Sequence, residues 1–175
     1  ALPICPAWVK YCEIFYPELL SNLSSAKSPI SMQSTLVKTY FADKINVKAK
    51  DIINIVIAPC TAKKSEINRK ELSYTDKDTN YVLTTRELSM LLKEENININ
   101  ELRGSKFDSP LGTGSSAGVI FGNSGGVCEA ALRTAYYFIT GKYLKKKELV
   151  FNDLRGMKGI KTATVKIGDK DINVA

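Results

Sequence analysis

The chain has 175 residues, of which 44% are hydrophobic and 25% charged, so a packed core of one domain or of one lobe of a larger domain is expected. No apolar stretch approaches the ~20 residues that a membrane-spanning helix needs, and the N-terminal residues lack the basic region of a signal peptide. The formal net charge of +7 comes from scattered lysines, apart from the run at 142–148, which we interpret as a solvated connection. An acidic electron carrier and a nucleic acid are both compatible with this charge, and composition does not decide between them.

Histidine and cysteine usage limit the chemistry further. The absence of histidine excludes Ser-His-Asp and Cys-His catalysis and any histidine-ligated zinc site within this sequence. The spacing of the four cysteines matches neither a zinc ribbon nor a clustered ferredoxin motif. A secreted disulfide framework is not expected for a chain of this size without a signal sequence, so we expect reduced thiols and a cytoplasmic location. The cysteines are Cys5, Cys12, Cys60 and Cys128.

Two helices are predicted at the N-terminal end. Residues 5–23 place apolar side chains at helical spacing, and Pro17 is expected to end or bend this helix. A second helix is predicted over 28–45, with Ser28 as the N-cap and Pro29 at the first helical position.

The middle of the chain predicts a parallel β-structure. Residues 51–60 form a run of isoleucine and valine that is typical of a strand buried on both faces. A short strand and a helix capped near Thr84 or Thr85 follow over 80–95. Because ligands of open α/β sheets bind beyond the carboxyl ends of the strands, Cys60 lies where a site is expected.

The C-terminal third begins with a loop of small residues at 109–126 and continues as a helix over 126–142. Strands are predicted within 148–156 and 160–175, and the last two form a hairpin across Gly168–Asp169. The alternation of strands and helices predicts an α/β fold, with a mostly parallel sheet flanked by helices and an antiparallel C-terminal hairpin. The small-residue loop lacks the GxxxxGK[ST] and GxGxxG patterns, so a phosphate site is not favoured.

Cys5 precedes the first predicted helix, where backbone N–H groups and the helix dipole stabilise a thiolate for metal ligation or nucleophilic attack. A small packing residue before a helix explains the same stretch equally well. We expect Cys12 in the core, because it shares a face with aromatic residues, and we expect Cys128 to be a packing residue near the start of its helix.

Cys60 is followed three residues later by Lys63, a pattern that indicates an anion or cluster site, since a lysine donates hydrogen bonds to negatively charged ligands. Glu66 is within reach as an ion-pair partner of a lysine or as a proton-relay carboxylate. The alternative interpretation of this stretch is a polar loop rim.

Several segments together resemble the active-site domain of the iron-only ([FeFe]) hydrogenases, in the same order and at similar spacing along nearly the whole chain. The resemblance implies one lobe of a two-lobed α/β domain that carries a six-iron H-cluster. That cluster is a [4Fe–4S] cubane joined through a cysteine to a two-iron subcluster with CO and cyanide ligands. The segments are "CPAWVKYCEIFYPELLSNLSSAKSPISM", "APCTAKKSE", "VLTTREL", "GVIFGNSGGVCEAALRTAYYFITGK" and "LRGMKGIKTATV".

The resemblance also implies roles for individual residues. Cys5 matches the first cubane ligand in the family motif TSCCPxW, and Cys60 matches the second in MPCxxKxxE. Lys63 matches the lysine that contacts a cyanide of the two-iron centre, and Ser24 matches a serine of the proton path. With Glu66 of the same motif, these residues form the predicted catalytic and cofactor-binding set.

The implied activity is the interconversion of protons, electrons and H2. We expect a ferredoxin-like electron carrier or fused iron–sulfur domains as partners, and neither a nucleic-acid partner nor a membrane span.

The sequence departs from the family pattern at several positions. The CxGGC motif with the last two cubane cysteines is missing from the sequence, and neither Cys12 nor Cys128 aligns with a ligand. We therefore expect residues 1–175 to be one partial domain that holds an incomplete cluster or none. Ile4 stands where the family has the cysteine that hands protons to the two-iron centre, and Ala58 replaces a methionine beside the cluster.

These departures define the alternative function. Sensory members of the family carry similar changes around the cluster, so the alternative is a regulatory H2-binding or iron–sulfur module with little turnover. Eukaryotic-type relatives that carry iron–sulfur clusters without H2 chemistry are more distant in sequence pattern.

Overall fold

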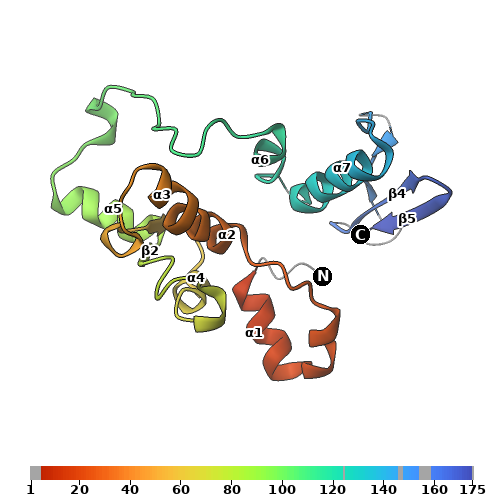
Figure 1. The fold of residues 1–175 in the computed structure, drawn as a ribbon, viewed down its shortest axis with the longest axis horizontal. Helices are drawn as coiled ribbons and strands as arrows, with labels where there is room; N and C mark the ends of the chain where they lie inside the picture. Colours follow the sequence, from red (N-terminus) through yellow and green to blue (C-terminus); the bar gives the residue numbers. More distant parts are fainter. Residues whose placement is uncertain (1–4, 124, 146–147, 154–158, 175) are drawn as a thin grey trace. The chain divides into compact units, whose positions relative to one another are not determined.

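The computed structural model describes residues 5–123, 125–145, 148–153 and 159–174. The chain divides into two compact units, residues 1–111 and residues 112–175, which are described one at a time (Figure 1). None of the helices formed by the described residues is long and apolar enough to cross a membrane.

The first helix of the first unit follows the predicted pattern. Helix α1 spans Pro6–Phe15 and has Cys5 at its N-cap. It gives way to a short 3₁₀ helix, η1, at Pro17–Asn22. The predicted interruption at Pro17 is confirmed, because a proline has no N–H to continue the helical hydrogen bonds.

Helix α2 spans Pro29–Leu36 and begins at the predicted N-cap. The Ser28 hydroxyl accepts a hydrogen bond from the Ser31 N–H at 3.3 Å, so it satisfies one of the free donors at the helix start. The helical path continues as a π-helical turn, η2 (Val37–Phe41), and α3 (Ala42–Lys44).

Two short parallel strands form the sheet of the first unit. β1 (Ile55–Ile57) pairs in register with β2 (Tyr81–Leu83). The N–H of Ala58 still donates to the Leu83 carbonyl at 2.9 Å, and Pro59 then ends the ladder because it has no N–H to donate. Short 3₁₀ turns complete the connections at η3 (Ala49–Asp51), η4 (Lys70–Leu72) and η5 (Ile99–Glu101).

Each strand of this sheet leads directly into a helix. α4 (Ala62–Glu66) follows β1, and α5 (Thr85–Glu94) follows β2. Thr84 caps α5 in a capping box with Glu87, which resolves the predicted choice between two threonines.

The prediction that β1 is buried on both faces is wrong. Ile55 and Ile57 are 52% and 53% exposed, whereas Val56, which points to the opposite face, is half-buried. A sheet of two strands offers few neighbours, and about half of the surface of each isoleucine remains exposed. Burial of an apolar run depends on the layer packed against it, which sequence pattern alone does not supply.

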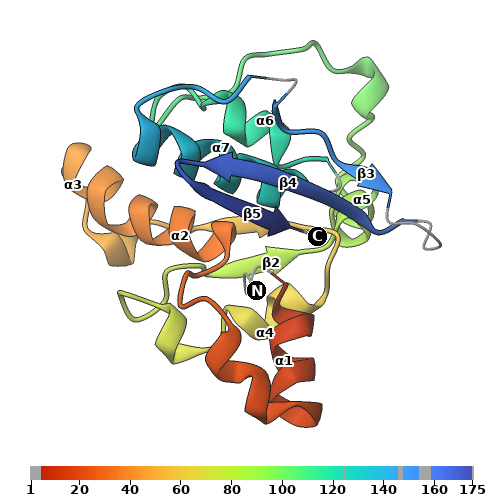
Figure 2. The ribbon, with the colours of Figure 1, turned by 90° about the vertical axis from the view of Figure 1, so that its right-hand side faces the viewer.

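The described residues of the second unit include helices α6 and α7 and an antiparallel sheet (Figure 2). β4 pairs with both β3 and β5, and the hairpin between β4 and β5 turns at Gly168, whose φ is +60°. The predicted hairpin is confirmed. The elements are α6 (Ser116–Ile120), α7 (Gly126–Thr140), β3 (Asn152–Asp153), β4 (Lys161–Ile167) and β5 (Lys170–Val174).

The predicted α/β class is confirmed, but parallel pairing is a smaller part of it than expected. Among the described residues, parallel pairing joins only β1 and β2, while β3, β4 and β5 pair antiparallel. β1 stops at a proline and β2 at a helix cap, so neither strand extends further. Apolar side chains on one face of β4 pack with residues of the preceding connections. This core consists of Leu144, Leu149, Ala163, Val165 and Ile167.

Glycine is required where α7 begins. A Cβ on Gly126 would lie 1.8 Å from the backbone oxygen of Ile120, a distance that no side chain tolerates. The missing side chain therefore lets the start of α7 approach the end of α6.

Candidate functional site

The two predicted cluster cysteines lie at the N-terminal ends of helices that pack against each other. Cys5 is the N-cap of α1 and is exposed, and Cys60 lies two residues before α4 and is half-buried. Helices α1 and α4 are in contact. Pro6 and Thr61, the residues that follow the two cysteines, line the same hollow of about 330 Å³. The fold thus brings the two cysteine-bearing segments to one place.

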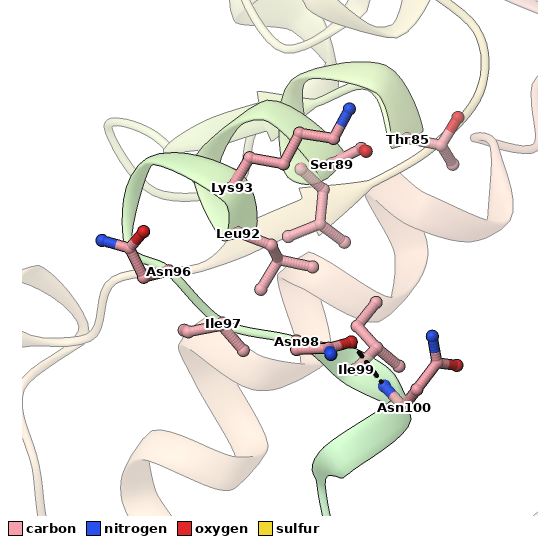
Figure 3. Close-up of a pocket in the computed structure, with 10 residues that line it drawn as sticks. Thr85, Ser89, Leu92, Lys93, Asn96, Ile97, Asn98, Ile99 and Asn100 are labelled. Carbon is pink, nitrogen blue, oxygen red and sulfur yellow. Dashed lines mark hydrogen bonds between the residues drawn. The ribbon is translucent and has the colours of Figure 1, made fainter.

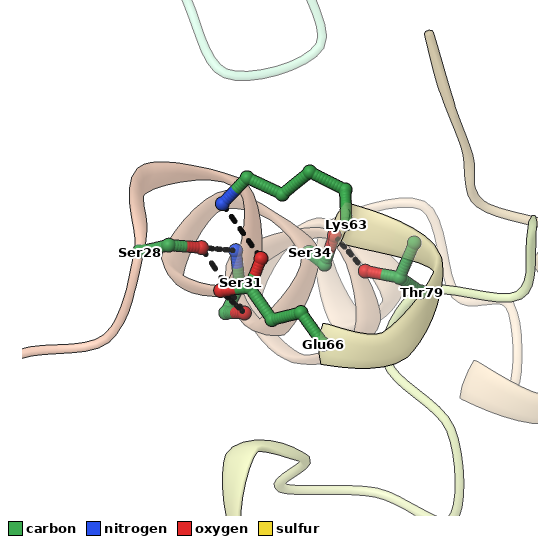
Figure 4. A network of polar contacts seen from close by, with 6 residues as sticks. All are labelled: Ser28, Ser31, Ser34, Lys63, Glu66 and Thr79. Carbon is green, nitrogen blue, oxygen red and sulfur yellow. Dashed lines mark hydrogen bonds and ion pairs between the residues drawn. The ribbon is translucent and has the colours of Figure 1, made fainter. Parts of the chain in front are cut away.

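A buried ion pair occupies the inner side of α4 (Figure 4). The Lys63 Nζ lies 2.6 Å from the Glu66 Oε2, and their side chains are only 11% and 4% exposed. Removing two charges from water costs free energy that their attraction only partly returns, so such a pair is weak evidence for stability. Buried ionisable groups of this kind cluster at functional sites.

A second hollow connects the ion pair to the predicted proton-path serine. This hollow of about 160 Å³ is lined by Ser24, Ser28 and Glu66. Pro6 lines it as well as the hollow beside Thr61, so the two spaces share a wall at the start of α1. Ser24 is half-buried, and its hydroxyl accepts a hydrogen bond from the backbone of Ala26 at 3.1 Å.

Arg69 lies at the rim of this hollow and was not predicted from the sequence. Its guanidinium pairs with Glu13 of α1 and, at 2.7 Å, with Glu71. Hydrogen bonds to Glu13 and then to Glu71 raise the pKa of Arg69, and the hydrogen bond from Arg69 lowers the pKa of Glu71. Glu13 lies 56 residues before Arg69 in the sequence, and Glu71 lies outside the APCTAKKSE segment. No local pattern in the sequence therefore indicates this cluster.

Asp78 was also missed, although it is almost fully buried at 2% exposure. Its carboxylate accepts hydrogen bonds from the backbone N–H groups of Tyr74 and Thr75 and from the hydroxyls of Thr75 and Thr35. Burial raises the pKa of Asp78, but these hydrogen bonds outweigh it, so the pKa lies below its ordinary value. Three of these bonds hold the turn at residues 74–78, and the bond from Thr35 joins this segment to α2.

A larger hollow of about 570 Å³ lies beside α5 (Figure 3). Its described lining residues include none of the predicted thiols or carboxylates. Leucine and isoleucine side chains line it, together with Asn96, Asn98 and Asn100. Size alone therefore does not identify the site, and the chemistry points to α1, α2 and α4.

The remaining predictions for individual residues have different outcomes. Cys12 is fully buried, which confirms its expected place in the core, and Cys128 is half-buried. Ala58 is buried, and Ile4 lies outside the described residues. Among the described residues, no group of three or more Cys, His, Asp or Glu side chains gathers to hold a metal ion. Two thiols, of Cys5 and Cys60, and the Lys63 amine are the groups that the prediction places at a cluster, and thiols are of the ligand type that iron–sulfur clusters use.

Comparison with known proteins identifies the family of the chain. Residues 3–175 match the family described as iron only hydrogenase large subunit, C-terminal domain. The chain is 46% identical over 96% of its length to the NADP-reducing hydrogenase subunit HndD of Solidesulfovibrio fructosivorans, and covers 28% of that relative. It is 45% identical over 98% of its length to the periplasmic [Fe] hydrogenase large subunit of Nitratidesulfovibrio vulgaris, and covers 40% of it.

A solved structure agrees with the fold as well as the sequence. An apo [FeFe]-hydrogenase HydA1 from Chlamydomonas reinhardtii superposes with a TM-score of 0.76 and 42% identity over 95% of this chain and 43% of its own. The chain spans less than half the length of each of these proteins. On the match of residues 3–175, the chain belongs to the family of the iron-only hydrogenase large subunit, C-terminal domain.

Proposed function

We propose that residues 1–175 form part of the active-site domain of an [FeFe]-hydrogenase, and that the whole protein interconverts H2 with protons and electrons. The observation that carries this proposal is the meeting of the two cysteine-bearing helix starts beside the buried Lys63–Glu66 pair. The names of the relatives, hydrogenases at 45–46% identity, support turnover and do not favour the sensory alternative.

In this proposal Cys5 and Cys60 are two of the cubane ligands. Thiolates are the usual ligands of iron–sulfur clusters, and each of these two thiols is at least partly accessible. When bound, the cluster supplies the electron transfer and the H2 chemistry. The further ligands belong to parts of the protein that the described residues do not include.

Lys63 acts in this proposal as a donor of hydrogen bonds to an anionic ligand of the two-iron subcluster. An ammonium group has three N–H donors, so the amine is able to contact such a ligand while it keeps its bond to Glu66. Glu66 supplies the opposite charge that makes a buried ammonium tolerable.

Ser24 and Glu66 form the proposed proton route of this chain. Both line the 160 Å³ hollow, which is large enough for several water molecules. The Ser24 hydroxyl accepts a proton from one neighbour while donating its own to the next, and a Glu66 oxygen receives the proton from water in the hollow. The route ends in the buried ion pair with Lys63.

The proposed partner is an electron carrier of the ferredoxin type or a fused iron–sulfur domain, which the hydrogenase relatives support in general terms. A cytoplasmic location remains a prediction from cysteine usage, because one relative of similar identity is named as periplasmic.

The test uses the full-length protein loaded with a synthetic two-iron precursor. Cys60→Ala should remove the iron–sulfur absorption band and H2 evolution from reduced methyl viologen, because a cubane ligand is lost. Cys128→Ala is the matched control, since Cys128 is a half-buried thiol that aligns with no ligand. Full iron content and activity in Cys60→Ala would contradict the proposal.

A further inference from the structure

The hydroxyl groups at the start of α2 form a chain of hydrogen bonds that ends on Glu66 (Figure 4). The Ser28 hydroxyl donates to the Ser31 Oγ at 3.4 Å, and the Ser31 hydroxyl donates to the Glu66 Oε1 at 3.4 Å. The other carboxylate oxygen of Glu66, Oε2, accepts from Lys63 at 2.6 Å. The two oxygens of Glu66 thus face two different donors, one from α2 and one from α4.

The direction of these bonds follows from the carboxylate at their end, since a carboxylate only accepts hydrogen bonds. Ser31 therefore donates its single hydroxyl proton to Glu66. The Ser31 Oγ accepts in turn from the Ser28 hydroxyl, whose oxygen accepts from the Ser31 backbone N–H at 3.3 Å. Hydrogen bonds aligned in series strengthen one another where the local dielectric constant is low. The three partners are 1%, 8% and 3% exposed, so these bonds are largely shielded from bulk solvent.

Other hydrogen bonds also hold α2 in place. The Thr79 hydroxyl donates to the Ser34 Oγ at 2.7 Å, and the Thr35 hydroxyl donates to Asp78 at 2.7 Å, so these shorter bonds join α2 to the segment before β2. The Ser31–Glu66 bond joins α2 to α4 instead, and it acts directly on the orientation of the Glu66 carboxylate.

We propose that Ser31 is a positioning residue for the amine of Lys63 and acts through Glu66. By holding one carboxylate oxygen, Ser31 fixes where the other lies, and that oxygen fixes the end of a flexible lysine side chain. This inference rests on the proposed function for what the amine contacts, but the positioning itself does not require a bound cluster.

The first measurement is made on the cluster-free full-length protein. Amines are acetylated with an N-hydroxysuccinimide ester, and the rate at each lysine is read by mass spectrometry. Ser31→Ala should speed modification of Lys63 about fivefold, the factor that corresponds to the loss of one hydrogen bond of ordinary net strength. Lys64 is the internal control, because it lies on the same helix, is 42% exposed and pairs with Glu87 instead. Its rate should not change.

Two further variants separate positioning from loss of packing. Ser34→Ala removes another buried hydroxyl of the same helix, one that bonds to Thr79, and should leave the Lys63 rate unchanged. Ser31→Thr keeps a hydroxyl and should restore the slow rate. Equal acceleration in Ser31→Ala and Ser34→Ala, or none in Ser31→Ala, would overturn the inference.

The second measurement uses the loaded protein and reads the infrared cyanide stretching bands. Ser31→Ala should shift a cyanide band and Ser34→Ala should not. A changed acetylation rate without a band shift would leave the positioning role intact and refute the proposed contact between Lys63 and the two-iron subcluster. The two hypotheses therefore fail on different observations.

Discussion

The two units of the chain bury different kinds of side chain. Among the described residues, every buried polar or charged side chain lies in residues 1–111, whereas those buried in residues 112–175 are apolar. An apolar core gains free energy in proportion to the area removed from water, but a buried charge or hydroxyl must be repaid by partners. Burial of polar groups thus lowers the stability of the first unit where the proposed chemistry lies, whereas the apolar core of the second unit stabilises its fold. The polar set is Ser28, Ser31, Ser34, Lys38, Lys63, Glu66, Asp78 and Thr79.

The largest effect is expected from breaking the buried ion pair. Glu66→Ala leaves the Lys63 ammonium buried without this counter-charge and should lower the free energy of unfolding by about 3–5 kcal/mol. Urea denaturation measures the change.

Replacing both members of the pair sharpens the comparison. Lys63→Met with Glu66→Leu should be close to the wild type in urea, because an apolar pair of similar volume avoids the desolvation cost. The same double variant should lose H2 turnover. A double variant as unstable as Glu66→Ala would mean that the pair serves stability after all.

In the second unit, we expect a core substitution to lower stability without changing the proposed site. Leu149→Ala opens a cavity beside the β4 strand and should cost about 3 kcal/mol, since Leu149 is 5% exposed in the core of the second unit. Hydrogen exchange of the amides in β4 and β5 should report the loss. The Lys63 acetylation rate is the control, and a large increase there would show that stability and site are not separable as described.

Asp78→Asn should have an intermediate effect of about 2 kcal/mol, because the carboxylate accepts four hydrogen bonds and the amide carries no charge. The lowered pKa of Asp78 adds a pH dependence. Its contribution is fully present above the ordinary value of 3.8 and is lost as the pH falls through the lower folded value. The difference between wild type and variant in denaturant midpoint should therefore shrink below pH 4, and a difference that grows would contradict this account.

The smallest effect is expected at Glu87, which pairs with Lys64 on the surface. The hydrogen bond from Lys64, followed by those from Thr84, lowers the pKa of Glu87 to about 2. Glu87→Gln keeps the capping box and loses only the charge, so the melting temperature at pH 7 should change less than in Asp78→Asn. This small difference is present above pH 4.5 and should disappear near pH 2; a persistent difference would point to a packing defect.

Local features of the fold were predictable from the sequence. The interruption at Pro17, the cap at Ser28 and the hairpin at Gly168 each depend on the conformational limits of one or two neighbouring residues. The positions of Cys5 and Cys60 at helix starts follow from the same kind of local signal, although their role as ligands remains a prediction.

Contacts between distant segments were not predictable in this way. Ser31 meets Glu66 across 35 residues, and Thr35 meets Asp78 across 43, so neither pair leaves a spacing pattern in the chain. Serine and aspartate are most often surface residues. Here they are buried because α2 lies against α4 and against the segment that precedes β2. The prediction that Ile55 is buried was wrong for the same reason, because its burial depends on which segments pack against the sheet.

The glycine at the start of α7 has a consequence for natural and laboratory variation. Because a backbone oxygen occupies the place of its missing methyl group, even alanine at Gly126 forces α6 and α7 apart. A saturation library selected for H2 uptake should return a single amino acid at this codon, while the neighbouring codon for Val127 tolerates several, and this contrast locates the α6–α7 junction from sequencing reads alone.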